Sequence, residues 1–260
     1  MTLLLTEIYV GTDMHDVTII FAADRRISYE KKFHALCKKI FRVPYLNAGI
    51  GFFGLAEVGR RPHATPMSDW LTSFINKNHD ARTLRDFAHR LNDELNGAVP
   101  RTSKTSNPSG FHIAGFNQDG LPEFWFVRNI ETMDQHSYMG FLDHYSVTED
   151  FLTRDARREI GYDGASLKIP EPRMRAYRNG DIRGHVVAWK EFDRVLKNVL
   201  LGFLDLQDFR SLRTISDYVE FTKFKMELIA AVYEKYCKAS LIGKPIDAFS
   251  IVNPASSNQT

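Results

Sequence analysis

The sequence has little cysteine, no long apolar run and no excess of charge, and each shortage excludes a class of protein. The two cysteines, Cys37 and Cys237, are too far apart to form a paired metal or redox motif. The longest apolar stretches fall far short of a bilayer span. The formal net charge is only +2, from 34 basic and 32 acidic residues, so neither nucleic acid nor a membrane is an expected partner. The nine histidines lack metal-ligand spacing, and we expect neither a metal nor a cofactor.

The same shortages favour a cytoplasmic location. Isolated thiols fit a reducing compartment, and the N-terminal residues lack the basic start and small-residue cleavage site of a signal peptide. A hydrophobic content of 43% over 260 residues is enough to bury a core. We therefore expect a single domain over residues 1–252 and a flexible polar tail over residues 253–260.

What is present is an ordered succession of strands and helices. Runs rich in β-branched and apolar residues, separated by turn residues, predict three strand pairs and a closing strand, over residues 2–10 and 17–24, 37–43 and 46–53, 111–116 and 123–127, and 246–252. Helical spacing predicts helices beginning near Ser68 and Thr83, and others around 192–203 and 216–236. Residues 100–110 lack periodicity and predict a mobile loop. Separate runs of strands and helices favour two stacked sheets with helices outside them.

Four stretches resemble the proteasome-like branch of the N-terminal nucleophile hydrolases. They are FAADRRIS, CKKIFRVPYLNAGIGFFGLAE, GFHIAGFNQDGLPEFWFV and LIGKPIDAFSIV, and they follow the family's order at comparable spacing. The resemblance covers residues 1 to about 130 fairly continuously and about 190–252 more loosely. It implies an α+β fold, a four-layer αββα sandwich of two antiparallel β-sheets flanked by helices. Residues 131–185 do not match and are expected to form a divergent insertion.

The resemblance implies that Thr2 does the chemistry. In such enzymes the mature chain begins with Thr, whose hydroxyl attacks the scissile amide while its own α-amine, titrating at roughly pH 8, serves as base. By this resemblance Lys39 lowers the pKa of that amine, Asp24 holds Lys39, and the turn at Gly54 supplies an N–H to the oxyanion. Removal of Met1 would expose Thr2 without a self-cleaving propeptide.

The register expected for the first hairpin favours Thr2 over its rival. If Val10 pairs with Val17 across the loop, Thr2 falls opposite Arg25, one residue after the aspartate. The rival nucleophile, Thr6, would then lie farther along the strand, away from that aspartate. The hairpin therefore predicts that Thr2 is brought to the aspartate, and the resemblance implies that Lys39 joins them.

Several positions depart from the family's pattern. Phe53 stands where the family has its catalytic-turn glycine, with Gly54 one residue later, and a phenylalanine there would obstruct substrate. The family also places an aspartate and a serine in the turn before the last strand. Here Ser240 is available, but no acidic residue lies between Glu234 and Asp247. These departures keep open the alternative that the site is degenerate.

The favoured function is a threonine-type N-terminal nucleophile hydrolase, a self-compartmentalised peptidase that cleaves peptide or amide bonds. The resemblance implies three partners: a peptide or unfolded protein substrate, identical subunits in a homo-oligomeric ring, and an ATPase unfoldase. One alternative is a catalytically inactive proteasome-like scaffold subunit. The other is a small-amide hydrolase whose pocket is shaped by residues 131–185.

Overall fold

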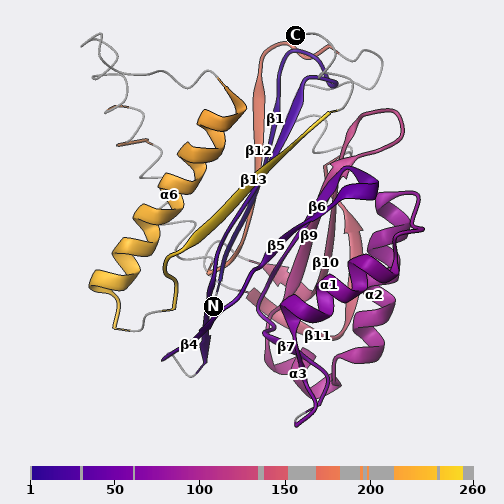
Figure 1. The fold of residues 1–260 in the computed structure, drawn as a ribbon, viewed down its shortest axis with the longest axis vertical. Coiled ribbons are helices and arrows are strands. Elements are labelled where there is room, and N and C mark those ends of the chain that lie inside the picture. The colour runs from indigo at the N-terminus through magenta and orange to yellow at the C-terminus, as the bar shows by residue number, and fades with distance from the viewer. Residues whose placement is uncertain are drawn as a thin grey trace.

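Two antiparallel sheets form the centre of the molecule (Figure 1). The computed structural model describes residues 2–29, 32–60, 62–133, 138–151, 168–181, 194–195, 198, 214–238 and 241–253. The first sheet contains, in spatial order, β12 (Arg173–Gly180), β1 (Leu3–Val10), β2 (Val17–Asp24) and β13 (Ile246–Val252). The second contains β11 (Tyr138–Glu149), β10 (Pro122–Met133), β9 (Gly110–Phe116), β6 (Ala48–Phe53) and β5 (Ile40–Val43). Two small sheets pair β3 (Arg26–Tyr29) with β4 (Lys32–Leu36), and β7 (Glu57–Val58) with β8 (Thr65–Pro66).

The first hairpin has the predicted register. Val10 pairs with Val17 and Leu4 with Ala23, so the long loop absorbs the residues between the two strands. The closing strand is also confirmed, because β13 runs antiparallel to β2 along its free edge. β12 pairs with the other edge of β1, with Gly180 opposite Leu3. Strand β1 is therefore internal to the sheet, and its first residues are enclosed by neighbours on both sides.

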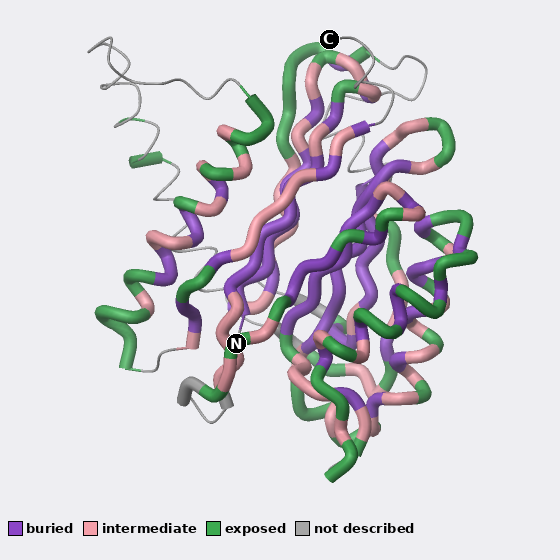
Figure 2. Tube along the Cα trace, viewed as in Figure 1, coloured by how far each residue is buried: buried purple, intermediate pink, exposed green. Residues whose placement is uncertain are grey.

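Strand β1 is apolar on both faces because both are covered. Leu3 and Leu5 pack toward α6 (Ile215–Tyr236), while Leu4 and Ile8 pack toward the second sheet. A strand buried on both faces loses the usual alternation of apolar and polar residues. Figure 2 shows the consequence: buried residues run along the strands of both sheets, and exposed ones gather on the helices and at the ends.

Helices cover the outer face of the second sheet. α1 (Met67–Lys77) and α2 (Leu84–Ala98) lie there, and the Thr83 hydroxyl caps α2 by accepting the Asp86 N–H. The predicted mobile loop at 100–110 is wrong, because it contains the short helix α3 (Arg101–Ser106). The amide of Asn129, on β10, donates to the carbonyls of Lys104 and Asn107. These contacts between distant residues order a polar segment that has no periodicity of its own.

The predicted class, a four-layer αββα sandwich of two antiparallel sheets flanked by helices, is corrected by the structure. Among the residues that the structure describes, strand makes up 42% and helix 31%, so this part of the protein is mostly β. The described residues contain four α-helices and four antiparallel sheets, two of which have only two strands. On the first sheet, α6 is the one helix of the described residues that runs along β2 and β13. The prediction failed because strands continue where helix or irregular chain was expected.

Part of the segment 131–185 is strand: β11 and β12 lie within it, one in each large sheet. Most of the helix predicted at 192–203, and the tail after residue 253, lie outside the described residues. In the part of the chain that the structure describes, no helix is both long and apolar enough to cross a membrane.

Candidate active site

Three of the residues predicted for the site meet at the start of β1. Thr2 directly precedes the strand and is 5% exposed, while Asp24 ends β2 and Lys39 directly precedes β5. Asp24 is fully buried, and Lys39 is only 2% exposed. A lysine and an aspartate are almost never buried to this extent unless they are paired.

The carboxylate of Asp24 organises the site. Its Oδ1 accepts hydrogen bonds from the Leu3 N–H at 2.8 Å and from Lys39 Nζ at 2.9 Å. Its Oδ2 accepts the Arg26 N–H at 3.2 Å, and Lys39 Nζ also donates to the Arg26 carbonyl at 2.6 Å. Because each charge is paired and further hydrogen-bonded, the burial cost of both ions is offset. One carboxylate oxygen thus holds the lysine and the backbone of the residue after Thr2 together.

Burial is the largest influence on the Asp24 carboxyl, and it raises the pKa of that group above its usual range. The Lys39 ammonium and the Leu3 N–H act in the opposite direction, because they stabilise the carboxylate. The ion pair is held out of water next to the Leu3 backbone, where charges interact more strongly than in solvent.

A hydrogen bond to Thr2 itself comes from a residue that sequence reasoning missed. The Asp181 N–H donates to the Thr2 carbonyl at 2.8 Å, and the Asp181 carboxylate accepts the Tyr233 hydroxyl of α6 at 2.7 Å. Gly180 has φ +100°, and a Cβ there would collide with the Thr2 carbonyl oxygen. In the sequence, the only sign of this contact is the pair Gly180-Asp181 at the end of a polar stretch, in a segment that does not resemble the family.

The turn at Gly54 has a backbone conformation that only glycine adopts without strain. Its φ is +89°, and a Cβ would collide with the carbonyl oxygen of Pro108. Within the described part of the chain, no hydrogen bond from the Gly54 N–H occurs. Phe53 is 1% exposed, and its ring packs among the core residues Phe126 and His112. The ring therefore lies in the core and not over the site, contrary to the expected obstruction.

A groove of about 850 Å³ adjoins this turn. Gly54 lines it, together with Ile27 and Ser28 of β3 and with Arg101 and Thr102 at the start of α3. Thr2 is not among the lining residues. The groove is large enough for a peptide-sized ligand, since ligand pockets measure about 300–1,000 Å³.

The rival nucleophile, Thr6, is fully buried in the middle of β1. Its hydroxyl lies 3.0 Å from His112 Nδ1, and His112 Nε2 lies 2.5 Å from Asn179 Oδ1. These are the residue types of a nucleophile, a base and an orienting group. However, Thr6 and His112 are both 0% exposed, so the chain of hydrogen bonds joins the two sheets where no substrate arrives.

Ser240, the serine expected before the last strand, lies outside the described residues. Among the residues that the structure describes, no three His, Cys, Asp or Glu side chains gather as a metal ion would require.

A scan against models of known protein families finds none that matches the chain, and a search of curated proteins finds no match either. Membership of the proteasome-like branch accordingly stays a proposal.

Proposed function

We propose that the protein is a threonine-type N-terminal nucleophile hydrolase that cleaves peptide or amide bonds, with Thr2 as nucleophile and base. One observation carries the proposal: Asp24 Oδ1 binds both Lys39 Nζ and the N–H of the residue that follows Thr2. The buried Lys39 is held next to Leu3, the first residue of β1, where its ammonium can act on a neighbouring α-amine. It favours the neutral form of a nearby amine by like-charge repulsion.

The proposed reaction needs Thr2 to be the first residue, because otherwise its nitrogen is an amide and no base. The α-amine takes the proton from Thr2 Oγ, which attacks the substrate carbonyl carbon, and the Gly54 N–H stabilises the oxyanion. The C–N bond then breaks, and the α-ammonium gives its proton to the leaving amine. Water hydrolyses the resulting ester with the same amine as base, which restores the hydroxyl and releases the acid.

Removal of Met1 is part of this proposal. With Met1 present the Thr2 nitrogen lies within the chain, and Thr2 is only 5% exposed. The groove beside Gly54 would take an extended peptide, with the scissile carbonyl near the Gly54 N–H. From the resemblance we also propose a cytoplasmic ring of identical subunits that degrades unfolded protein delivered by an ATPase unfoldase.

Hydrolysis of a short peptide coupled to a fluorogenic amine tests the proposal, with the intact mass of the same sample. We expect a mass lower by one methionine and steady release of the amine. Thr2→Ala should abolish the release, and Thr2→Ser should retain part of it because serine keeps the hydroxyl beside the amine. A retained Met1, or hydrolysis that survives Thr2→Ala, would overturn the proposal in favour of the inactive scaffold or another site.

A further inference from the structure

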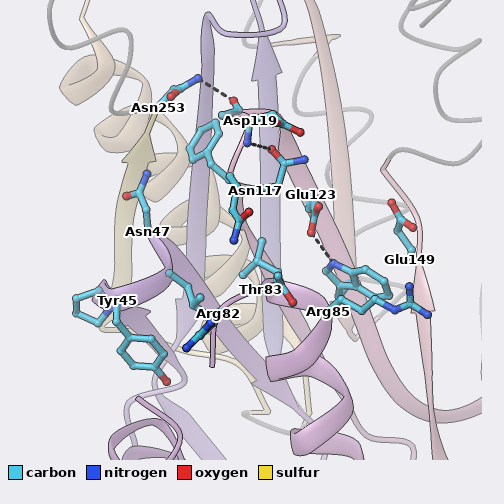
Figure 3. Close-up of a pocket in the computed structure, with 17 residues that line it drawn as sticks. Tyr45, Asn47, Arg82, Thr83, Arg85, Asn117, Asp119, Glu123, Glu149 and Asn253 are labelled. Carbon is cyan, nitrogen blue, oxygen red and sulfur yellow. Dashed lines mark hydrogen bonds between the residues drawn. The ribbon is translucent and has the colours of Figure 1, made fainter. Parts of the chain in front are cut away.

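A second cavity, of about 790 Å³, lies at the other end of the strands from Thr2 (Figure 3). It is bounded by the turn η1 (Pro44–Leu46), the start of α2 and the turn between β9 and β10. The eight residues of β1 span about 26 Å, so the two sites are well separated. We propose that this cavity binds a short peptide with both termini free. The inference stands independently of the proposed hydrolase activity.

Three asparagines build the rim of the cavity. The Asn47 amide donates to the Val252 carbonyl at 3.1 Å, and the Asn117 side chain accepts two backbone N–H groups of the β9–β10 turn. Asn253 is fully buried, and its amide donates to the Gly120 carbonyl at 2.8 Å. Loops held by such internal hydrogen bonds are already ordered, so a ligand does not have to order them on binding.

Two arginines at the start of α2 line the cavity: Arg82, directly before the N-cap Thr83, and Arg85 in the first turn. A cation near a helix N-terminus is unfavourable, because the helix dipole is positive there. Neither guanidinium forms an ion pair or hydrogen bond within the described residues, whereas Arg90, two turns farther along, pairs with Asp80 and Asp86. Two uncompensated cations at the positive end of a helix are explained if the cavity takes up an anionic group.

Carboxylates face the same cavity. Asp119, Glu123 and Glu149 line it, and Glu123 is oriented because its Oε2 accepts the Trp125 indole N–H at 3.0 Å. In Figure 3, Arg82 lies on the side of Tyr45, and Glu123 and Glu149 lie across the cavity from it.

Arg85 lies on the same side of the cavity as the carboxylates, whereas Arg82 lies across from them (Figure 3). Arg82 and the facing carboxylates together match a ligand that carries both charges. A simple anion would be attracted by Arg82 and repelled by the carboxylates, so this arrangement selects against it. A peptide with free ends can place its carboxylate at Arg82 and its ammonium at Glu123. The volume exceeds what a single amino acid fills and suits a few residues, with the aromatic faces of Tyr45 and Trp125 available to side chains.

Titration calorimetry with trialanine tests the inference, using the Thr2→Ala chain so that any hydrolysis at the first site is removed. We expect saturable binding that weakens at least about tenfold when the peptide is N-acetylated and C-amidated. Arg82→Gln should cause a similar loss. Glu123→Gln removes the charge but keeps an oxygen for the Trp125 indole, and it should also weaken binding. Lys238→Gln, an exposed lysine outside the cavity, is the matched control and should change nothing.

Three results would overturn the inference. One is the absence of saturable trialanine binding in the millimolar range. The second is equal affinity for the blocked peptide or for inorganic phosphate, which would mean that the cavity does not bind the peptide's carboxylate and ammonium at the same time. The third is binding that survives Arg82→Gln, because such binding would belong to another part of the chain. Since Thr2 plays no part in this test, its failure leaves the proposed hydrolase activity untouched.

Discussion

The two ends of strand β1 treat charge in opposite ways. At the Thr2 end, Asp24 and Lys39 are withdrawn from water and form an ion pair at 2.9 Å. At the other end, Arg82 is exposed at the mouth of a cavity and has no ion-pair partner within the described residues. A fixed buried charge can tune the pKa of a neighbouring group, whereas an exposed uncompensated charge can attract a ligand. The difference indicates chemistry at one end and recognition at the other.

The largest expected effect is the loss of hydrolysis in Thr2→Ala. We expect amine release from a fluorogenic peptide to fall to the uncatalysed background, because the variant lacks the hydroxyl that forms the ester. Arg82→Gln should leave hydrolysis unchanged, because Arg82 lies at the other end of the strands. A substantial loss of hydrolysis in Arg82→Gln would break the division between the two ends.

Removal of the Lys39 side chain should have the largest effect on stability. Lys39→Ala leaves the buried Asp24 carboxylate without its partner, and we expect a loss of about 3–5 kcal/mol in the free energy of unfolding, measured in urea. The matched control is Lys77→Ala, since Lys77 is 70% exposed and pairs with Glu94 at the surface. That pair should contribute at most about 1 kcal/mol. Equal losses in the two variants would contradict the burial argument.

Gly54→Ala should destabilise the Thr2 end by about 1–3 kcal/mol, because alanine is strained at φ +89° and its methyl group meets the Pro108 carbonyl. The melting temperature reports this loss. Gly97→Ala in α2 is the control with the opposite sign. Nothing lies within 4 Å of the added methyl group, and alanine in a helix is favoured over glycine by about 0.5–1 kcal/mol. If both variants melt at a lower temperature, steric strain at Gly54 is not the cause.

The smallest expected effect is a pH-dependent one in the loop beyond Val10. The ion pair with Lys168 and the His15 N–H lower the pKa of Asp13 below its usual value of 3.8. A lowered pKa in the folded state contributes stability above pH 3.8 and loses it as the pH falls through the folded pKa. Asp13→Asn should therefore cost less than about 1 kcal/mol near neutrality and nothing in stronger acid. A difference that grows on acidification would contradict this sign.

The Thr2 end was predictable from sequence because its geometry is local. The position of the loop, with Val10 opposite Val17, determined the register of β1 and β2, and this register placed Thr2 beside Asp24. Lys39 followed from the family resemblance. The closing strand β13 was equally readable, because its apolar residues are bounded by Gly243 and Pro245.

The remaining parts depend on contacts between distant residues. Asp181 reaches Thr2 because β12 pairs with β1, but β12 has the sequence RMRAYRNG, whose mostly exposed or half-buried residues carry no apolar alternation. Helix α3 is polar and is ordered by Asn129 from another strand. The predicted class was too helical for a related reason: apolar spacing cannot show that chain without a clear pattern will be recruited as strand.

The most direct test of the central claim is to locate the residue modified by an epoxyketone peptide, a reagent that closes a ring with both a hydroxyl and an α-amine. We expect mass spectrometry of the digested protein to find the adduct on an N-terminal peptide that begins at Thr2, with no adduct in Thr2→Ala. An adduct on any other residue, or an unmodified chain whose Thr2 is already exposed, would contradict the claim that Thr2 is an active N-terminal nucleophile.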